Sequence, residues 1–207
     1  MRFSVLKVTF FGMALALAAP FAATSALAQS RGAEPSAKQA PATPQRDRSQ
    51  DIEFLFGALK AAPDAASAKL VESRIMALWI ASGSDTADLL MSRVKTAMDA
   101  QDLDLAIKLL DAILELRPSY AEAWNRRATV YFLKKDYGRS LTDIRQVLAR
   151  EPRHFGAIAG LGMIMQEFGE EKRALEAFRR ALELHPHLQK IPELVKGLTE
   201  KVDGRDI

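Results

Sequence analysis

The stretch that decides the fold runs from Ser119 to Pro152 and reads SYAEAWNRRATVYFLKKDYGRSLTDIRQVLAREP. Its apolar side chains recur every three or four residues, which is the period of an amphipathic helix. Asp136 and Gly138 mark a turn in the middle, and Pro152 cannot continue a helix. The stretch therefore predicts two helices joined by a short turn.

The same pattern occurs three times with a period of 34 residues, over residues 87–118, 119–152 and 153–186. Large apolar residues recur in the first helix of each segment, and small residues recur where the two helices approach each other. A proline closes each segment. The residues that define the repeat are Leu90, Trp124, Ile158, Tyr131, Gly162, Ala106, Ala174, Phe178, Pro118, Pro152 and Pro186.

This layout resembles the tetratricopeptide repeat family, whose signature reads Trp-x2-Leu-Gly-x2-Tyr, then Ala-x3-Phe, then Pro. Trp124 and Tyr131 match it in the middle segment, and Gly162, Ala174 and Phe178 match it in the last. The resemblance covers about half of the chain. It implies an all-α fold, an α-solenoid of stacked hairpins whose first helices line the concave face. The order of segments also resembles short exported bacterial proteins of this family, whose common theme is upkeep of the cell envelope.

Both flanks of the repeats carry helical patterns. Residues 51–86 predict an irregular hairpin with Pro63 between its helices, and residues 187–207 predict a capping helix and a tail. An internal repeat exposes an apolar face wherever its neighbour is missing. We therefore expect the hairpin to cover the upstream end of the stack. The downstream end should be covered through Ile191, Leu194, Leu198 and Val202.

The first 28 residues are typical of an export signal. A positively charged start precedes an apolar run over residues 8–19, and Ala26-Leu27-Ala28 fits a cleavage site. The alternative is an uncleaved membrane anchor, but the run is shorter than the roughly 20 apolar residues that span a bilayer. We expect cleavage after Ala28, a periplasmic location and no membrane span in the mature chain.

Composition excludes several classes of protein. The 29 basic and 26 acidic residues nearly balance, which argues against a nucleic-acid-binding protein. Cysteine is absent, so disulfides, thiolate metal sites and cysteine nucleophiles are excluded. Residues 29–50 are rich in Ser, Pro, Ala, Gln and Arg and predict a disordered linker.

No catalytic, cofactor-binding or metal-binding motif stands out. GxSxG, HExxH, P-loop and GxGxxG patterns do not occur. His185 and His187 are the one pair of histidines close enough in sequence to suggest a metal site, but they flank Pro186 at a helix end without a supporting cysteine. We therefore expect a protein that is not an enzyme, has no cofactor and binds a protein or peptide partner.

Candidate partner-binding residues lie on the expected concave face. Basic members of this set can receive an acidic segment through charge-assisted hydrogen bonds, or they can form a solvated face with internal salt bridges. Arg93 and Arg127 stand where the signature has leucine, so they either pair with an acid such as Glu115 or Glu122 or point into the groove. The candidates are Lys95, Asn125, Arg126, Arg127, Thr129, Arg153, His154 and Met163.

Three hypotheses for the function follow. The first is a periplasmic adaptor that holds a segment of an envelope protein in its concave groove. The second is self-association through an end face, with Trp79 or the C-terminal helix pairing between copies. The third is binding of a cell-wall polymer, which requires exposed aromatic side chains in a groove.

Overall fold

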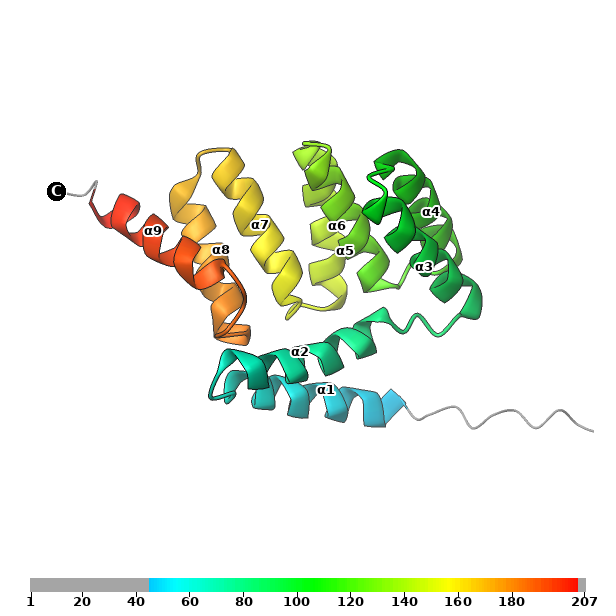
Figure 1. The fold of residues 1–207 in the computed structure, drawn as a ribbon, viewed down its shortest axis with the longest axis horizontal. Helices are drawn as coiled ribbons and strands as arrows, with labels where there is room; N and C mark the ends of the chain where they lie inside the picture. Colours follow the sequence, from blue (N-terminus) through cyan, green and yellow to red (C-terminus); the bar gives the residue numbers. More distant parts are fainter. Residues whose placement is uncertain (1–44, 205–207) are drawn as a thin grey trace, which may run out of the picture. The chain divides into compact units, whose positions relative to one another are not determined.

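The computed structural model describes residues 45–204, except for the side chains of residues 45–49 and 203. This part of the chain forms nine helices and contains no strand (Figure 1). The predicted all-α solenoid is therefore confirmed for the described residues. The predicted signal over residues 1–28 and most of the predicted linker lie outside them.

Three helical hairpins stand side by side in a row (Figure 1). Aspartates cap the second helices of the first two, since Asp102 and Asp136 accept the backbone N–H of Leu105 and Arg139 at 3.0 and 3.1 Å. The hairpins are α3 (Asp85–Asp99) with α4 (Leu103–Leu116), α5 (Ala121–Leu133) with α6 (Tyr137–Arg150), and α7 (Phe155–Glu167) with α8 (Glu171–Leu184).

The residues that define the repeat lie where the register predicts. Ala106, Ala174 and Phe178 are fully buried between the helices of their hairpins, and Ile158 and Tyr131 are also buried. Leu90 and Trp124 pack against the core while remaining partly exposed, and the Trp124 indole N–H donates to the backbone oxygen of Pro118 at 2.9 Å. Gly162 lies against the Phe178 ring. Pro118, Pro152 and Pro186 are exposed at the ends of the hairpins.

The last helix, α9 (Ile191–Asp203), covers the downstream end of the row. Ile191 and Leu198 are buried in the core that includes α8, and Leu194 and Val202 pack against it. The expected downstream cap is confirmed.

The N-terminal hairpin consists of α1 (Gln45–Lys60) and α2 (Ala65–Ile80). The Asp64 carboxylate caps α2 by accepting the Ser67 N–H at 2.7 Å. Helix α1 begins inside the predicted linker 29–50. Residues 45–50 include two glutamines and two arginines, which favour a helix even without burial.

This hairpin does not cover the upstream end of the row, so that expectation was wrong. Its apolar core includes Phe155, Leu184 and Leu188, which belong to the third hairpin and the loop after it. Figure 1 shows α1 and α2 crossing beside the hairpins rather than continuing the row. The aromatic ring of Trp79 explains the position, because it lies 4.2 Å from the His154 ring and 5.2 Å from the Phe155 ring.

Candidate functional site

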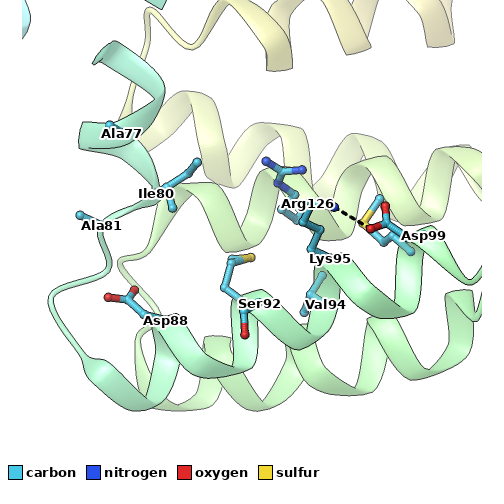
Figure 2. Close-up of a pocket in the computed structure, with 11 residues that line it drawn as sticks. Ala77, Ile80, Ala81, Asp88, Ser92, Val94, Lys95, Asp99 and Arg126 are labelled. Carbon is cyan, nitrogen blue, oxygen red and sulfur yellow. Dashed lines mark hydrogen bonds and ion pairs between the residues drawn. The ribbon is translucent and has the colours of Figure 1, made fainter. Parts of the chain in front are cut away.

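A groove of about 810 Å³ lies between the end of α2 and the helices α3 and α5 (Figure 2). Six of its lining residues are apolar: Ala77, Ile80, Ala81, Met91, Val94 and Met98. Met91, Val94 and Met98 are three and four residues apart, which places them on one face of α3. Methionine side chains adapt to apolar ligands of different shape. The groove therefore suits an apolar side chain or a short apolar segment.

Charged residues line the groove in equal number of each sign. Figure 2 shows Asp88 at one end and Lys95, Asp99 and Arg126 towards the other. Lys95 Nζ donates to Asp99 Oδ2 at 2.6 Å, and Asp88 Oδ1 accepts the Ser82 N–H at 3.1 Å. These four charges sum to zero, so the electrostatics of the groove do not select an acidic segment.

The wall formed by α2 is fixed by hydrogen bonds to the second hairpin and the loop before it. The hydroxyl of Tyr120 donates to the backbone oxygen of Ile80. Arg117 Nη2 donates to the backbone oxygen of Ser82 at 2.8 Å. Burial is the main reason why the pKa of Tyr120 is raised well above its ordinary value. The Tyr120 hydroxyl therefore stays protonated and keeps its role as donor.

A buried carboxylate, Glu122, links Arg126 of the groove to His154, whose ring stacks on Trp79 of α2. It accepts hydrogen bonds from Arg126 Nε at 2.6 Å and Asn125 Nδ2 at 3.0 Å, and it lies 3.3 Å from His154 Nε2. Burial by itself raises the pKa of Glu122, but the hydrogen bond with His154 and the charge of Arg126 outweigh it and lower the pKa. Glu122 is therefore ionised and holds Arg126 at the edge of the groove.

A second, smaller hollow of about 150 Å³ lies between α5, α6 and α7. Asn125, Thr129 and Met163 line it together with Phe132, Gly156 and Gly160. The two glycines leave room beside α7 for a side chain from a bound segment. Because Arg126 of the groove and Thr129 of the hollow are three residues apart on α5, the hollow and the groove lie on neighbouring parts of one surface.

The structure brings five of the eight candidate residues to this surface. Lys95 and Arg126 line the groove, and Asn125, Thr129 and Met163 line the smaller hollow. Arg127, Arg153 and His154 lie elsewhere and make internal contacts. The contribution of Ile80 and its neighbours on α2 could not be predicted from the sequence, because nothing in the repeat period indicates where the N-terminal hairpin packs.

Arg127 forms ion pairs within the fold. Its Nε and Nη2 donate to both oxygens of Asp143 at 2.8 and 2.9 Å, and its Nη1 donates to Asp111 Oδ1 at 2.6 Å. The guanidinium also lies 4.8 Å from the centre of the Trp124 ring. Hydrogen bonds to Asp143 are the main reason why the pKa of Arg127 is raised, against the effect of burial. Arg127 is thus structural, with acids other than Glu115 and Glu122 as partners.

Arg153 and His154 contact the N-terminal hairpin and line neither the groove nor the smaller hollow. Arg153 Nη1 lies 2.9 Å from Glu53 Oε1, and its guanidinium lies 4.4 Å from the centre of the Phe56 ring. His154 is buried, and its Nδ1 accepts the Ala157 N–H at 3.1 Å as the cap of α7. The contacts of Arg153 with Glu53 and Phe56 and the stacking of His154 on Trp79 depend on where the N-terminal hairpin packs, which the sequence does not indicate.

His185 and His187 bind different parts of the N-terminal hairpin. His185 Nε2 lies 3.5 Å from Glu72 Oε2, and His187 Nε2 lies 3.1 Å from the backbone oxygen of Ala62. Within residues 45–204, no group of three or more histidines and acids is placed to hold a metal ion. Both side chains therefore take part in docking the hairpin.

Acidification is expected to weaken this docking. Burial lowers the pKa of His185, although Glu72 opposes the shift, while His187 and Lys69 add to it. Because the folded pKa is depressed, the contribution of neutral His185 is complete above its unfolded pKa of about 6.5 and declines as pH falls below that value. Thermal unfolding of the wild type and His185→Gln measures the effect. The variant should lose less stability between about pH 7.5 and about pH 5.5, and equal losses would contradict the prediction.

Comparisons with known proteins agree with the hairpin row. The profile described as tetratricopeptide repeat matches residues 92–143 and 135–188. A TPR repeat-containing protein of Rhizobium etli is 35% identical over 209 residues, covering 99% of this chain and 97% of the relative.

Two solved structures illustrate the shared fold. The first TPR of Spaghetti (RPAP3) bound to the HSP90 peptide SRMEEVD has a TM-score of 0.55 at 18% identity, covering 58% of this chain and 95% of that one. MamA has a TM-score of 0.53 at 20% identity, covering 71% and 84%. Identities this low show the fold alone. Among the described helices, none has both the length and the apolar character needed to cross a membrane.

Proposed function

Since this chain belongs to the tetratricopeptide repeat family, we propose that it is an adaptor that holds an apolar segment of a protein partner in the groove between α2, α3 and α5. The observation that carries the proposal is the combination of an apolar lining with balanced charges. An apolar segment gains free energy when its side chains leave water, and the groove requires no net charge from it. The role proposed is binding rather than catalysis.

The peptide named with the RPAP3 structure, SRMEEVD, contains three acids and one base. A groove that selects such a segment needs an excess of positive charge. In the present groove Lys95 is paired with Asp99, and Arg126 is paired with Glu122. We therefore propose a preference for apolar side chains over an acidic tail.

The place of action belongs to the proposal as well. The charged start, the apolar run and Ala26-Leu27-Ala28 support export and cleavage after Ala28. The proposed site of action is the periplasm, where the adaptor serves maintenance or assembly of the cell envelope. Residues 29–44 then stand between the cleavage site and the first described helix.

The two other hypotheses have less support. Binding of a cell-wall glycan calls for aromatic side chains, and none of the residues that line the groove is aromatic. Pairing through Trp79 conflicts with its stacking on His154. Pairing through α9 conflicts with the burial of its apolar stripe against α8.

Replacing Met91 with glutamate is expected to abolish partner capture, because it places a charge on the apolar lining of the groove. Loss of an anchoring contact of this kind costs about 2 kcal/mol or more of binding free energy. The full chain with a C-terminal tag is expressed in its source organism. It is then crosslinked to its partners and captured from the periplasmic fraction. Mass spectrometry identifies the stoichiometric partner and the first residue of the captured protein, which is expected to be Gln29.

The matched control is Leu70→Glu, which adds the same charge at an exposed leucine of α2 that does not line the groove. It should capture the partner as the wild type does. Equal capture by Met91→Glu and the wild type would exclude the groove. Recovery of an uncleaved protein outside the periplasmic fraction would exclude the proposed location.

A further inference from the structure

Helix α4 has an apolar stripe that the fold uses only in part, since Leu109 packs against the core while the two ends of the stripe are exposed. Its members are Leu105, Leu109, Ala112 and Leu116, which follow one another at intervals of four, three and four residues. Leu105 is 44% exposed and Leu116 is 54% exposed, while the two residues between them are partly buried. The adjoining face of α4 is buried in the core of the first hairpin. No segment within residues 45–204 covers the two outer leucines.

The other hairpins show that the scaffold does not require leucines at these positions. Thirty-four residues later, α6 carries Arg139, Asp143, Gln146 and Arg150 in the same places. In α8 the same four positions hold Arg173, Ala177, Arg180 and Leu184. Since α6 carries arginine at both outer positions, the fold does not account for the exposed Leu105 and Leu116 of α4. Exposed apolar surface of this kind marks an interaction site.

The position of α4 leaves this stripe accessible. Figure 1 shows α3 and α4 at the end of the row that lies opposite α9. The N-terminal hairpin packs on the third hairpin and does not cover this end. Leu89 of α3 is also exposed at 56%, although its equivalents Ala123 and Ala157 are buried. The first hairpin therefore keeps open a face that its successors bury.

The intervals of four, three and four residues are those of the apolar positions in a coiled coil. Lys108 and Glu115 are exposed beside the stripe and stand seven residues apart, so they occupy equivalent flanking positions with opposite charge. In an antiparallel pair of identical helices, Leu105 of one copy meets Leu116 of the other, and Lys108 meets Glu115. The stripe and its flanking charges are thus self-complementary.

We propose that two copies of this chain associate through an antiparallel pairing of their α4 helices about a two-fold axis. Each dimer contains two Lys108–Glu115 pairs and a seam formed by the stripe. Helix α4 has 14 residues and a length of roughly 21 Å, so the interface is small. A dissociation constant in the micromolar range is expected. The pairing is independent of the groove, which lies between α2, α3 and α5.

Light scattering of the purified protein at micromolar to millimolar concentrations tests the pairing. The wild type is expected to pass from monomer to dimer over this range. Leu105→Arg with Leu116→Arg gives α4 the residues that α6 carries at these positions, and this variant should remain monomeric. Leu70→Arg, at a leucine of α2 that is 73% exposed, should associate like the wild type. A wild type that stays monomeric, or an arginine variant that still dimerises, overturns the proposal.

Charge reversal tests the orientation of the two helices. Lys108→Glu and Glu115→Lys should each raise the dissociation constant about tenfold, because each replaces two attractive pairs per dimer by two repulsive ones. The double variant restores both pairs with their charges exchanged and should dimerise like the wild type. Circular dichroism confirms that each variant is folded. Failure of the double variant to recover affinity overturns the antiparallel α4 pairing.

Discussion

Replacement of Arg127 by leucine is expected to lower the free energy of unfolding by about 3 to 5 kcal/mol. Arg127 neutralises Asp143, whose side chain is only 3% exposed, through two parallel hydrogen bonds. Without the guanidinium, Asp143 stays buried without an opposite charge beside it. Asp111 is 47% exposed at its side chain, so water can solvate it and its contribution to the loss is small. Urea unfolding followed by circular dichroism measures the change.

Adding Asp143→Ala to Arg127→Leu should restore most of the lost stability. The third hairpin already has the two residues of the double variant, since Leu161 and Ala177 occupy the equivalent positions. Removing both members of a buried ion pair is often neutral, whereas removing one is not. The double variant is expected to unfold within about 1 kcal/mol of the wild type. A single variant as stable as the wild type would show that Arg127 does not hold the fold together.

Much of the fold could be predicted from the sequence because the repeat is built from local patterns. The 34-residue period placed the three hairpins, and the stripe that includes Ile191 and Leu198 indicated the downstream cap. The N-terminal hairpin was predicted as an element but placed at the wrong end. Its position depends on a contact of Trp79 with His154, and no local pattern specifies a contact between residues so far apart.

The site was predicted in part for the same reason. Residues on the first helix of a hairpin, such as Lys95, Arg126 and Thr129, could be assigned to the concave surface because helix periodicity fixes their direction. Ile80 could not be assigned, because it reaches the groove only through the packing of α2. The structural role of Arg127 could not be predicted, because its two partners lie on the flanking helices α4 and α6.

Replacement of Gly162 by leucine is expected to lower the free energy of unfolding by about 3 kcal/mol. A Cβ atom at this position would lie 2.5 Å from Cε1 and 2.7 Å from Cδ1 of the Phe178 ring. Phe178 is fully buried, so its ring has no free space to move into. Gly197→Leu is the matched control, since no atom lies within 4 Å of a Cβ built there. A Gly162→Leu variant that melts with the control would contradict the close approach of α7 and α8.

A double-mutant cycle at this contact tests how the repeat fills its core. Equivalent positions carry Gly162 with Phe178, Ala128 with Ile144, and Val94 with Leu110, so the hairpin with the smallest first residue has the largest second one. Gly162→Ala and Phe178→Ile should each cost about 1 to 3 kcal/mol, one by overpacking and the other by leaving a cavity.

Together, Gly162→Ala and Phe178→Ile reproduce the pair of the second hairpin, and the double variant should be more stable than the sum of the single losses predicts. A favourable coupling of about 1 kcal/mol or more, from urea unfolding of the four proteins, is the expected result. Additive losses would show that these positions do not compensate for each other. Coupling would instead explain why the first two hairpins keep the fold without the glycine and phenylalanine of the third. The side chains at the two positions fill the same space between the helices, so a change in one can compensate for a change in the other.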